Sequence, residues 1–155
     1  MKKLILFFIL TVSIGTLKAQ EIPANIATAL KNDDAATLTT LLTKDNINNC
    51  YGVYSLISQS IRDNAQKCFD LLIQKGADVN KTCNGYVPPL MHAAKYGRLE
   101  MVQTLIAKGA KADYKYDGDF KGENGPQKGE TAITYAEKYQ HDDVVEYLQS
   151  LKLKQ

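Results

Sequence analysis

The sequence predicts an all-α solenoid of about four helix-turn-helix units that are joined by short finger loops. The first observation is an internal repeat, because FDLLIQKGADVN, from Phe69, aligns with VQTLIAKGAKAD, from Val102, at an offset of 33 residues. The second is the helical spacing of the apolar residues, and the third is the glycine that ends each copy, Gly76 and Gly109. Such a helix pair cannot bury its own apolar face, so we expect the units to stack around one continuous core.

The first two units are the more divergent copies. IATALKNDDAATLTTLLTKDNIN is polar, as the exposed end of a stack requires. YSLISQSIRDNAQKCFDLLIQKGADVN follows it, with Asn64 where a stronger copy has glycine. We therefore place the first unit at about 22–50 and the second at about 51–83.

The third unit, at about 84–113, has the clearest pair of helices. Apolar residues that begin with Leu90 lie on one face of a short helix, Gly97 ends that helix, and a second apolar stripe runs from Met101 to Ile106. These residues predict two short antiparallel helices with a tight turn between them.

The fourth unit, at about 129–155, follows an insertion at 114–128. Gly129 comes sixteen residues after Asp113, whereas the matching glycine of the preceding loop comes seven residues after its aspartate. Insertions in repeat proteins lie in loops on one face, which is often the binding face. The predicted helix pairs of the four units are 23–31 and 35–43, 54–62 and 66–75, 89–96 and 99–108, and 132–139 and 142–150.

The repeated unit resembles the ankyrin repeat family. PPLMHAAKYGRLEMVQTLIAKGA is similar to the family pattern G-x-T-P-L-H-x-A-A-x-x-G-x-x-E-V-V-x-L-L-L-x-x-G-A. GETAITYAEKYQHDDVVEYL matches it with Ala132 for the proline and Gln140 for the glycine. The resemblance implies an ankyrin-repeat solenoid over 20–155 whose inner helices and fingers line one concave surface. It also implies a binding module whose partner is set by the variable residues.

The first 19 residues are predicted to form a secretory signal peptide. Two lysines precede an apolar run from Leu4 to Ile14, and Ala19 stands at the expected cleavage point. The run is shorter than the roughly 20 residues of a membrane-spanning helix, which makes an uncleaved anchor the weaker alternative. We expect a periplasmic or secreted protein with no membrane insertion after cleavage.

The charge of the mature chain gives no reason to expect nucleic acid as a partner. Lys2, Lys3 and Lys18 leave with the predicted signal peptide, so 19 basic residues become 16 against 17 acidic ones. The resulting net charge of about −1 favours neither nucleic acid nor anionic lipid. We expect a monomer that binds a protein partner and needs no cofactor.

No motif in the sequence carries a catalytic mechanism. The chain has no G-x-S-x-G, no glycine-rich phosphate loop and no closely spaced histidine pair. By the ankyrin resemblance His92 faces the concave groove, where we interpret it as a solvent-facing contact residue, and His141 is expected on the surface beside a turn. A catalytic histidine needs an oriented partner, and the sequence shows none. We therefore expect no catalytic residue and no metal ligand.

Three cysteines allow more than one arrangement. Cys68 lies on an apolar stripe and is expected to be a buried thiol. Cys50 and Cys83 are 33 residues apart, at equivalent places in consecutive loops, and export favours a disulfide between them. Equivalent points in stacked helical layers lie about 8–10 Å apart, however, beyond the ~7 Å limit for the Cα atoms of a disulfide unless the loops bend. The sequence leaves both arrangements open.

Tyrosines and cations are predicted to gather on the surface that the inner helices and fingers share. Tyr96 and Tyr139 occupy equivalent places in adjacent units, and tyrosine is enriched in the hot spots of protein interfaces. The predicted partner-binding residues are Arg62, His92, Lys95, Tyr96, Tyr114, Tyr116, Asp117, Phe120, Tyr135, Lys138 and Tyr139.

The insertion itself is open to three interpretations. Asp117 and Asp119 fit the start of a calcium loop, but Lys121 and Lys128 occupy two of its ligand positions. A slack linker would leave several aromatic side chains idle in water. We interpret the segment 113–130 as an enlarged finger that widens the groove.

The leading functional hypothesis is a non-catalytic protein–protein interaction module in the periplasm or outside the cell. A sharper version makes it an inhibitor or immunity-type partner of an exported enzyme or toxin. Two hypotheses of other classes are an ion-binding or sensor protein that uses the loop 113–130, and a structural envelope protein with no single tight partner.

Overall fold

The computed structural model describes residues 21–121 and 125–152, which form eight helices and one two-stranded sheet. The predicted signal peptide lies outside these residues. None of the helices in the described ranges is both long and apolar enough to span a membrane. The elements, in chain order, are α1 (Ala24–Lys31), α2 (Ala35–Leu41), β1 (Cys50–Tyr51), β2 (Tyr54–Ser55), α3 (Leu56–Arg62), α4 (Gln66–Gln74), α5 (Pro89–Lys95), α6 (Leu99–Ala107), α7 (Ala132–Lys138) and α8 (Asp142–Lys152).

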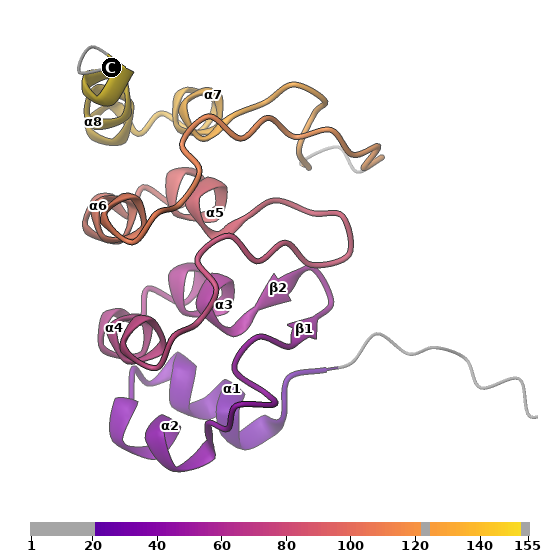
Figure 1. Ribbon diagram of the computed structural model, residues 1–155, viewed down its shortest axis with the longest axis vertical. Helices are drawn as coiled ribbons and strands as arrows, with labels where there is room; N and C mark the ends of the chain where they lie inside the picture. The colour runs from indigo at the N-terminus through magenta and orange to yellow at the C-terminus, as the bar shows by residue number, and fades with distance from the viewer. Residues whose placement is uncertain (1–20, 122–124, 153–155) are drawn as a thin grey trace, which may run out of the picture.

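The helices form four antiparallel hairpins that stack on one another (Figure 1). Each hairpin has an inner helix, α1, α3, α5 or α7, and an outer helix, α2, α4, α6 or α8. The inner helices pack on one another in order, α4 packs on α2, and α8 packs on α6. The loops between hairpins project as fingers toward one side of the stack (Figure 1). This arrangement confirms the predicted all-α solenoid.

The predicted helix boundaries agree with the structure to within two residues at each end. The predicted helix at 54–62 differs from the structure in its first two residues. Tyr54 and Ser55 form the strand β2, and the helix begins at Leu56. Ser55 is the N-cap of α3, because its hydroxyl accepts a hydrogen bond from the Ser58 N–H (3.4 Å). The sequence analysis predicted no strand, so this short sheet is new.

A residue with left-handed backbone stands at the turn of every hairpin. At Gly97 a side chain is also excluded by packing, because a Cβ atom there would overlap the ring of His141. The Nε2–H of His141 donates to the backbone carbonyl of Lys95 (3.0 Å). His141 therefore joins the third and fourth hairpins instead of lying free beside its turn. The four turn residues are Asp33 (φ 50°), Asn64 (φ 57°), Gly97 (φ 63°) and Gln140 (φ 61°).

The first turn also supports the second hairpin. The Asp33 carboxylate accepts hydrogen bonds from the backbone N–H groups of Lys67 (3.2 Å) and Cys68 (2.9 Å) at the start of α4. These groups have no partner within their own helix, and α4 has no side-chain cap of its own. Cys68 is fully buried, as predicted, and its thiol contacts the Ala29 carbonyl (3.6 Å).

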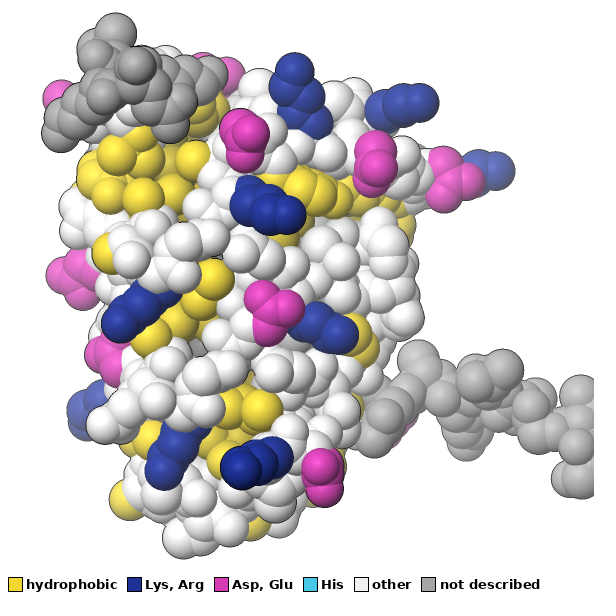
Figure 2. Space-filling view, viewed as in Figure 1, with side chains coloured by type: hydrophobic (Ala, Val, Ile, Leu, Met, Phe, Trp, Pro, Cys, Tyr) yellow, Lys and Arg dark blue, Asp and Glu magenta, His cyan; other side chains and the backbone are white. Residues whose placement is uncertain are grey.

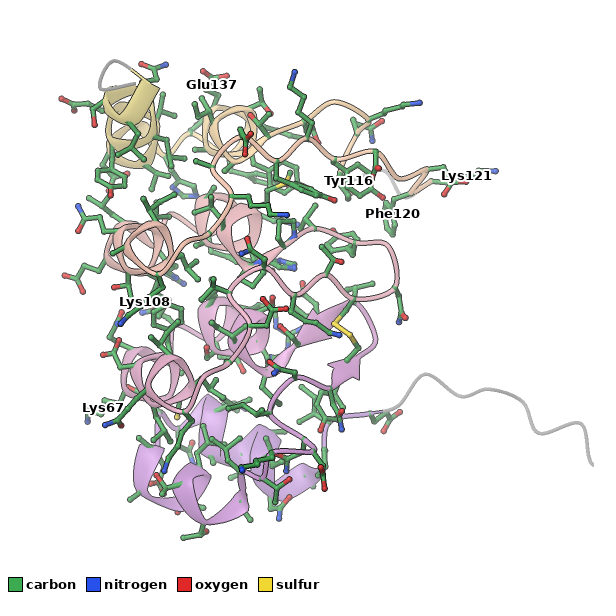
Figure 3. The ribbon with its side chains drawn as sticks, in the orientation of Figure 1. Lys67, Lys108, Tyr116, Phe120, Lys121 and Glu137 are labelled. Carbon is green, nitrogen blue, oxygen red and sulfur yellow. A yellow bond between two sulfur atoms is a disulfide. The ribbon has the colours of Figure 1, made fainter. Side chains whose placement is uncertain are left out.

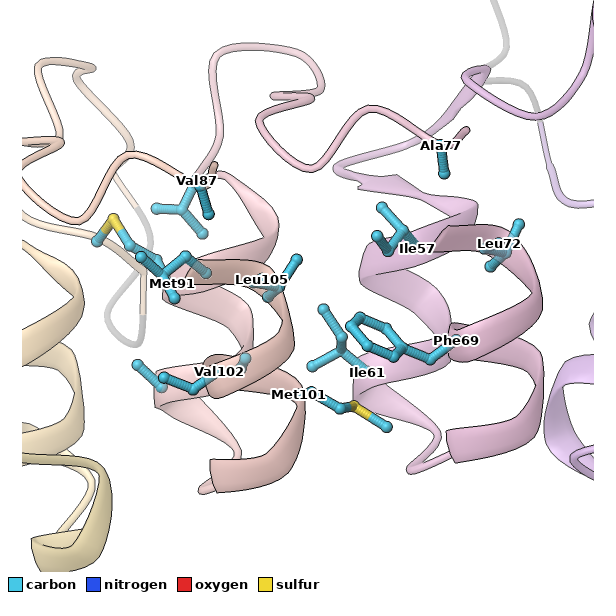
Figure 4. Close-up of a cluster of buried hydrophobic side chains, with 14 of the residues drawn as sticks. Ile57, Ile61, Phe69, Leu72, Ala77, Val87, Met91, Met101, Val102 and Leu105 are labelled. Atoms are coloured by element: carbon cyan, nitrogen blue, oxygen red, sulfur yellow. The ribbon is translucent and has the colours of Figure 1, made fainter. Parts of the chain in front are cut away.

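Buried apolar side chains fill the space between successive hairpins. Ile61 of α3 and Phe69 of α4 lie beside Met101 of α6, so the core continues from the second hairpin into the third (Figure 4). Each of these side chains is almost fully buried. Because the core runs along the stack, no hairpin buries its apolar face alone.

Asparagine side chains tie neighbouring loops together near their bases. The Asn48 side chain accepts a hydrogen bond from the Asp78 N–H (2.8 Å). One repeat later, the Asn80 side chain accepts from the Lys111 N–H (3.0 Å) and donates to the Gly109 carbonyl (3.1 Å). These bonds satisfy backbone groups in irregular segments and hold each loop against the next.

The first two fingers are joined covalently. β1 and β2 form a small antiparallel hairpin, and Cys50 in β1 forms a disulfide with Cys83 in the next finger. The Cα atoms are 5.4 Å apart, closer than the helical layers below them. Beside the disulfide, the Asn84 side chain donates to the Gly52 carbonyl (2.6 Å). The loops bend toward each other, which is the condition that the disulfide required.

Candidate functional site

A basic residue ends every inner helix. These residues occupy the same place in four stacked hairpins, so their backbones form one column along the stack. A cation at a helix C-terminus is also favourable for the helix itself, because it faces the negative end of the helix dipole. The four residues are Lys31, Arg62, Lys95 and Lys138.

Tyrosines connect the cations of the second and third hairpins. The Arg62 guanidinium lies 4.8 Å from the centre of the Tyr54 ring. The hydroxyl of Tyr54 is 3.2 Å from that of Tyr96, so one of the two donates a hydrogen bond to the other. Burial raises the pKa of Tyr96, which therefore stays protonated at neutral pH.

The third and fourth hairpins are connected in the same way. The Lys95 ammonium lies 5.8 Å from the centre of the Tyr96 ring and 5.1 Å from that of Tyr139. Tyr139 contacts the buried Tyr135 ring edge-on, with 5.6 Å between centroids, and the Lys138 ammonium lies 5.6 Å from the Tyr135 ring. We call the resulting continuous surface the cation–tyrosine strip, which consists of Tyr54, Arg62, Lys95, Tyr96, Lys138 and Tyr139.

Two of the three cations of the strip have a carboxylate partner. Arg62 contacts Asp63 (3.5 Å) and Lys138 contacts Glu130 (3.0 Å). Within residues 21–121 and 125–152, no carboxylate lies within ion-pair distance of Lys95. Lys95, the middle cation of the strip, is thus the one whose charge is least neutralised. On the face viewed in Figure 2, Lys and Arg side chains lie among Asp and Glu side chains, with no block of one sign.

The exposure predicted for His92 is wrong. Its side chain is 0% exposed and lies between the rings of Tyr54 (4.8 Å between centroids) and Tyr86 (5.6 Å). Neither ring nitrogen has a hydrogen-bond partner among residues 21–121 and 125–152. Burial, with smaller contributions from Lys95 and Arg62, lowers the pKa of His92 to about 3, so the ring is neutral at pH 7. His92 supports the strip from below because Tyr54 and Tyr86 cover it.

Two tyrosines that were predicted to contact a partner are buried instead. Tyr135 is 0% exposed because its place in α7 corresponds to that of His92 in α5, facing the preceding layer. Tyr116 is 2% exposed and closes the base of the enlarged finger. Its N–H donates to the Glu130 carbonyl (2.8 Å), and its carbonyl accepts from the Gly129 N–H (2.7 Å). The finger is therefore anchored at its base and is not a slack linker.

The remaining predicted residues of the finger differ in exposure. Phe120 is 42% exposed, and its ring meets the Tyr86 ring edge-on at 5.3 Å between centroids. Asp117 is exposed and Tyr114 is half-buried. Figure 3 shows Phe120 and Lys121 in the projecting part of the finger, on the side away from the outer helices. Phe120 thus connects the enlarged finger to the preceding one through Tyr86.

The chain is similar to known ankyrin repeat sequences. A family model described as ankyrin repeats (3 copies) matches residues 25–117 and 88–154. The chain belongs to the ankyrin repeat family. It is also similar to the "Ankyrin repeat, SAM and basic leucine zipper domain-containing protein 1" of Dasypus novemcinctus, with 41% identity over 44 residues. That match covers 28% of this chain and 9% of the Dasypus novemcinctus protein. Ankyrin repeats indicate a protein–protein interaction module.

The described part of this ankyrin domain contains no cluster of three His, Cys, Asp or Glu side chains that could hold a metal ion. Asp117 and Asp119, which fit the start of a calcium loop, are exposed and do not converge with a third carboxylate in that part of the chain. Residues 122–124 of this segment lie outside the described residues.

Sequence reasoning missed three residues of the site. Tyr54 was assigned to the start of a helix, but it lies in β2, where its ring reaches Arg62, His92 and Tyr96. Tyr86 was not considered, although it packs between His92 and Phe120. Lys31 could have been found by aligning the first hairpin on its turn residue, which places it level with Arg62.

Proposed function

We propose that this ankyrin domain binds a protein partner through the cation–tyrosine strip and the enlarged finger. The strip carries the proposal because it joins cations and tyrosines of three successive hairpins into one surface. Arg62 and Lys138 are exposed, and the other strip residues are half-buried, so each keeps a face for a partner. Tyrosine and arginine are enriched in interface hot spots.

The stacked hairpins would hold this surface in a fixed shape. The strip rests on buried side chains, of which His92 and Tyr135 are fully covered. A surface that is already ordered loses less conformational entropy on binding than a mobile one. A rigid strip of this kind suits a partner that is recognised without rearrangement of the ankyrin domain.

We also propose that the protein acts after export, in the periplasm or outside the cell. Its first 19 residues have the order of charges, apolar run and small residue that signal peptidases recognise. The Cys50–Cys83 disulfide supports the same proposal, because disulfides persist in oxidising compartments.

The proposed role is binding without catalysis. His92 is buried between two rings, and the Nε2–H of His141 is engaged by a backbone carbonyl. Neither of these two histidines, both in the described part of the chain, is therefore placed to exchange a proton with a ligand. A binding role also agrees with the ankyrin family.

The proposal can be tested by affinity capture from an extract of the native cell envelope. The bait is the purified protein, and the test variant is Tyr96→Ala combined with Tyr139→Ala. The matched control is Lys67→Ala combined with Lys108→Ala, which changes two exposed residues at the outer helices, opposite the fingers (Figure 3). Thermal melting checks that each variant is folded.

We expect the wild type and the outer-helix control to capture the same proteins and the strip variant to lose at least one of them. Interface tyrosines of this kind typically contribute about 1–2 kcal/mol or more to the free energy of binding. Their removal should therefore reduce the affinity at least about fivefold. A strip variant that keeps every partner of the wild type would remove the strip from the proposal.

A further inference from the structure

The column of cations has a period that constrains the shape of a ligand. We propose that the strip binds an extended, acidic segment of the partner, with a carboxylate at every third residue and one carboxylate for each hairpin. This inference rests on the proposed function, since it names the chemistry that the strip would recognise. The proposed ligand site adds Lys31 of α1 to the three cations of the strip, so that its four basic residues run from Lys31 to Lys138 in α7.

The spacing of the hairpins favours this geometry. Packed helices lie about 8–10 Å apart, so the backbones of successive basic residues are separated by about that distance along the stack. A polyproline II segment has three residues per turn and a rise of about 3.1 Å per residue, so every third side chain returns to the same face after about 9 Å. In a β-strand every third side chain would point to the opposite face. The period therefore favours the polyproline II form.

The cations at the start of the column share one hollow of the surface. A depression of about 410 Å³ between α1 and α3 is lined by Lys31, Arg62 and Asp63, with Ile22 and Ala27 beside them. A ligand side chain that enters this hollow would meet two cations at once. The hollow thus connects Lys31 to Arg62, the one step of the column at which no tyrosine of the described residues bridges two hairpins.

The centre of the strip offers unsatisfied donors. Lys95 has no carboxylate partner in the described part of the chain, and the rings of Tyr96 and Tyr139 flank its ammonium. In the Tyr54–Tyr96 pair, one hydroxyl donates to the other, and the accepting hydroxyl keeps its own hydrogen. This hydrogen can be donated to a carboxylate that lies on Lys95. An acidic side chain would therefore gain a charge-assisted hydrogen bond beside an ion pair.

The neighbouring carboxylates indicate how dense the negative charge of the ligand can be. Asp63 and Glu130 already contact Arg62 and Lys138 and neutralise part of their charge, so a ligand carboxylate would share each of these cations with a carboxylate of the domain. The same two groups would repel a backbone that carries one phosphate on every nucleotide. A peptide with an uncharged pair of residues between its acidic ones carries fewer negative charges along the strip and is repelled less, which favours a protein segment over a nucleic acid.

The test uses a labelled twelve-residue peptide that repeats Glu-Pro-Ala four times. A peptide with glutamine in place of glutamate is the matched ligand control, and a twelve-nucleotide oligothymidylate represents nucleic acid. Binding to the full, disulfide-bonded protein is measured by fluorescence anisotropy at low and at moderate salt. The protein variants are Lys95→Gln, Lys95→Gln with Lys138→Gln, and the outer-helix control Lys67→Gln with Lys108→Gln.

We expect the glutamate peptide to bind at least about tenfold more tightly than the glutamine peptide, and its affinity to fall as salt rises. Lys95→Gln should weaken binding about threefold to fivefold and the double strip variant about tenfold, in line with the strength of partly exposed ion pairs. The outer-helix control should stay within about twofold of the wild type.

Three results would overturn the inference. The first is that the glutamate and glutamine peptides bind equally well. The second is that Lys95→Gln binds the glutamate peptide as tightly as the wild type does. The third is that the oligothymidylate binds more tightly than the glutamate peptide and that Lys95→Gln abolishes this binding. The last result would assign the strip to nucleic acid. If native partners depend on Tyr96 and Tyr139 but not on Lys95, the proposed function stands and only the acidic ligand is rejected. If no native partner depends on the tyrosines, the proposed function itself fails.

Discussion

The first two fingers and the enlarged finger occupy equivalent places in the stack but are secured differently. The Cys50–Cys83 disulfide joins the first two, and the His92 ring lies between Tyr54 of one finger and Tyr86 of the next. The enlarged finger is held at its base by the backbone hydrogen bonds of Tyr116, and farther out the Phe120 ring contacts the Tyr86 ring. One region is cross-linked, whereas the other depends on local contacts.

This difference shows how one repeat can serve stability and the next can serve recognition. A cross-link between fingers limits how far the hairpins beneath them can separate. An enlarged finger with an exposed aromatic residue presents more surface for a partner, and its contacts with the core are made by Tyr114 and Tyr116 near its base. We therefore expect changes in the cross-linked region to affect the whole stack and changes in the enlarged finger to remain local.

Removing the disulfide should have the largest effect. The bond closes a loop of 33 residues, for which chain entropy predicts a loss of about 3–4 kcal/mol in the free energy of unfolding. Urea denaturation of the wild type with and without reductant measures this loss directly. We expect Cys50→Ser combined with Cys83→Ser to match the reduced wild type.

The same double variant supplies the control for reductant. Its remaining cysteine, Cys68, is buried, and burial, followed by the charge of Asp33, raises its pKa to about 12. Reductant should therefore leave the double variant unchanged. An unaltered urea midpoint for the reduced wild type would show that the cross-link does not stabilise the stack.

Acidification should have the next largest effect, through His92. Its pKa is about 3 in the folded protein against 6.5 in the unfolded chain, so between these values only the unfolded chain binds the proton. The free energy of unfolding should therefore fall as pH falls from about 6.5 toward 3, by about 1.4 kcal/mol per pH unit once below 6. Between pH 7 and pH 5 the loss from this residue is about 2 kcal/mol.

Urea denaturation at the two pH values measures the loss, and His92→Gln is the matched variant. Glutamine is chosen because Gln59 occupies the corresponding place in α3. Other groups titrate in both proteins, so the contribution of His92 is the difference between their pH dependences. If the wild type and the variant lose the same stability, burial of His92 has no influence on acid unfolding.

Phe120→Ala should have the smallest effect on global stability. The side chain is 42% exposed and its main aromatic contact is the edge of Tyr86, so we expect a loss of less than about 1 kcal/mol. Locally, the enlarged finger should be cleaved several times faster in limited proteolysis, because its contact with the preceding finger is lost. Lys121→Ala, in the same finger, should leave the cleavage rate near that of the wild type. A loss of global stability as large as that of the reduced protein would contradict the local role of this finger.

Much of the fold was predictable because repetition makes the sequence redundant. The 33-residue offset, the helical spacing and the turn residues each predict the same hairpin, and the structure places every helix end within two residues of its expected position. Cys68 was predicted to be buried because its neighbours on the helix show which face is apolar. Such assignments depend on local patterns, which a single sequence contains.

The exposure of individual side chains was less predictable. His92, Tyr116 and Tyr135 are polar enough to stand on a surface, and only their neighbours in adjacent layers bury them. The contacts of Tyr54 were not predicted, because this residue lies in a two-residue strand where a helix was expected. The disulfide was also undecided, because its formation depends on the bend of two loops.

The sequence by itself determined the repeated hairpin and its period, because these are properties of one unit and its copies. Only the tertiary structure decided which tyrosines face outward, which cations they join and which finger is cross-linked. The physical reason is that these features arise between units, where contacts depend on how the layers stack and how the loops bend. The cation–tyrosine strip is therefore visible only when the copies are placed side by side.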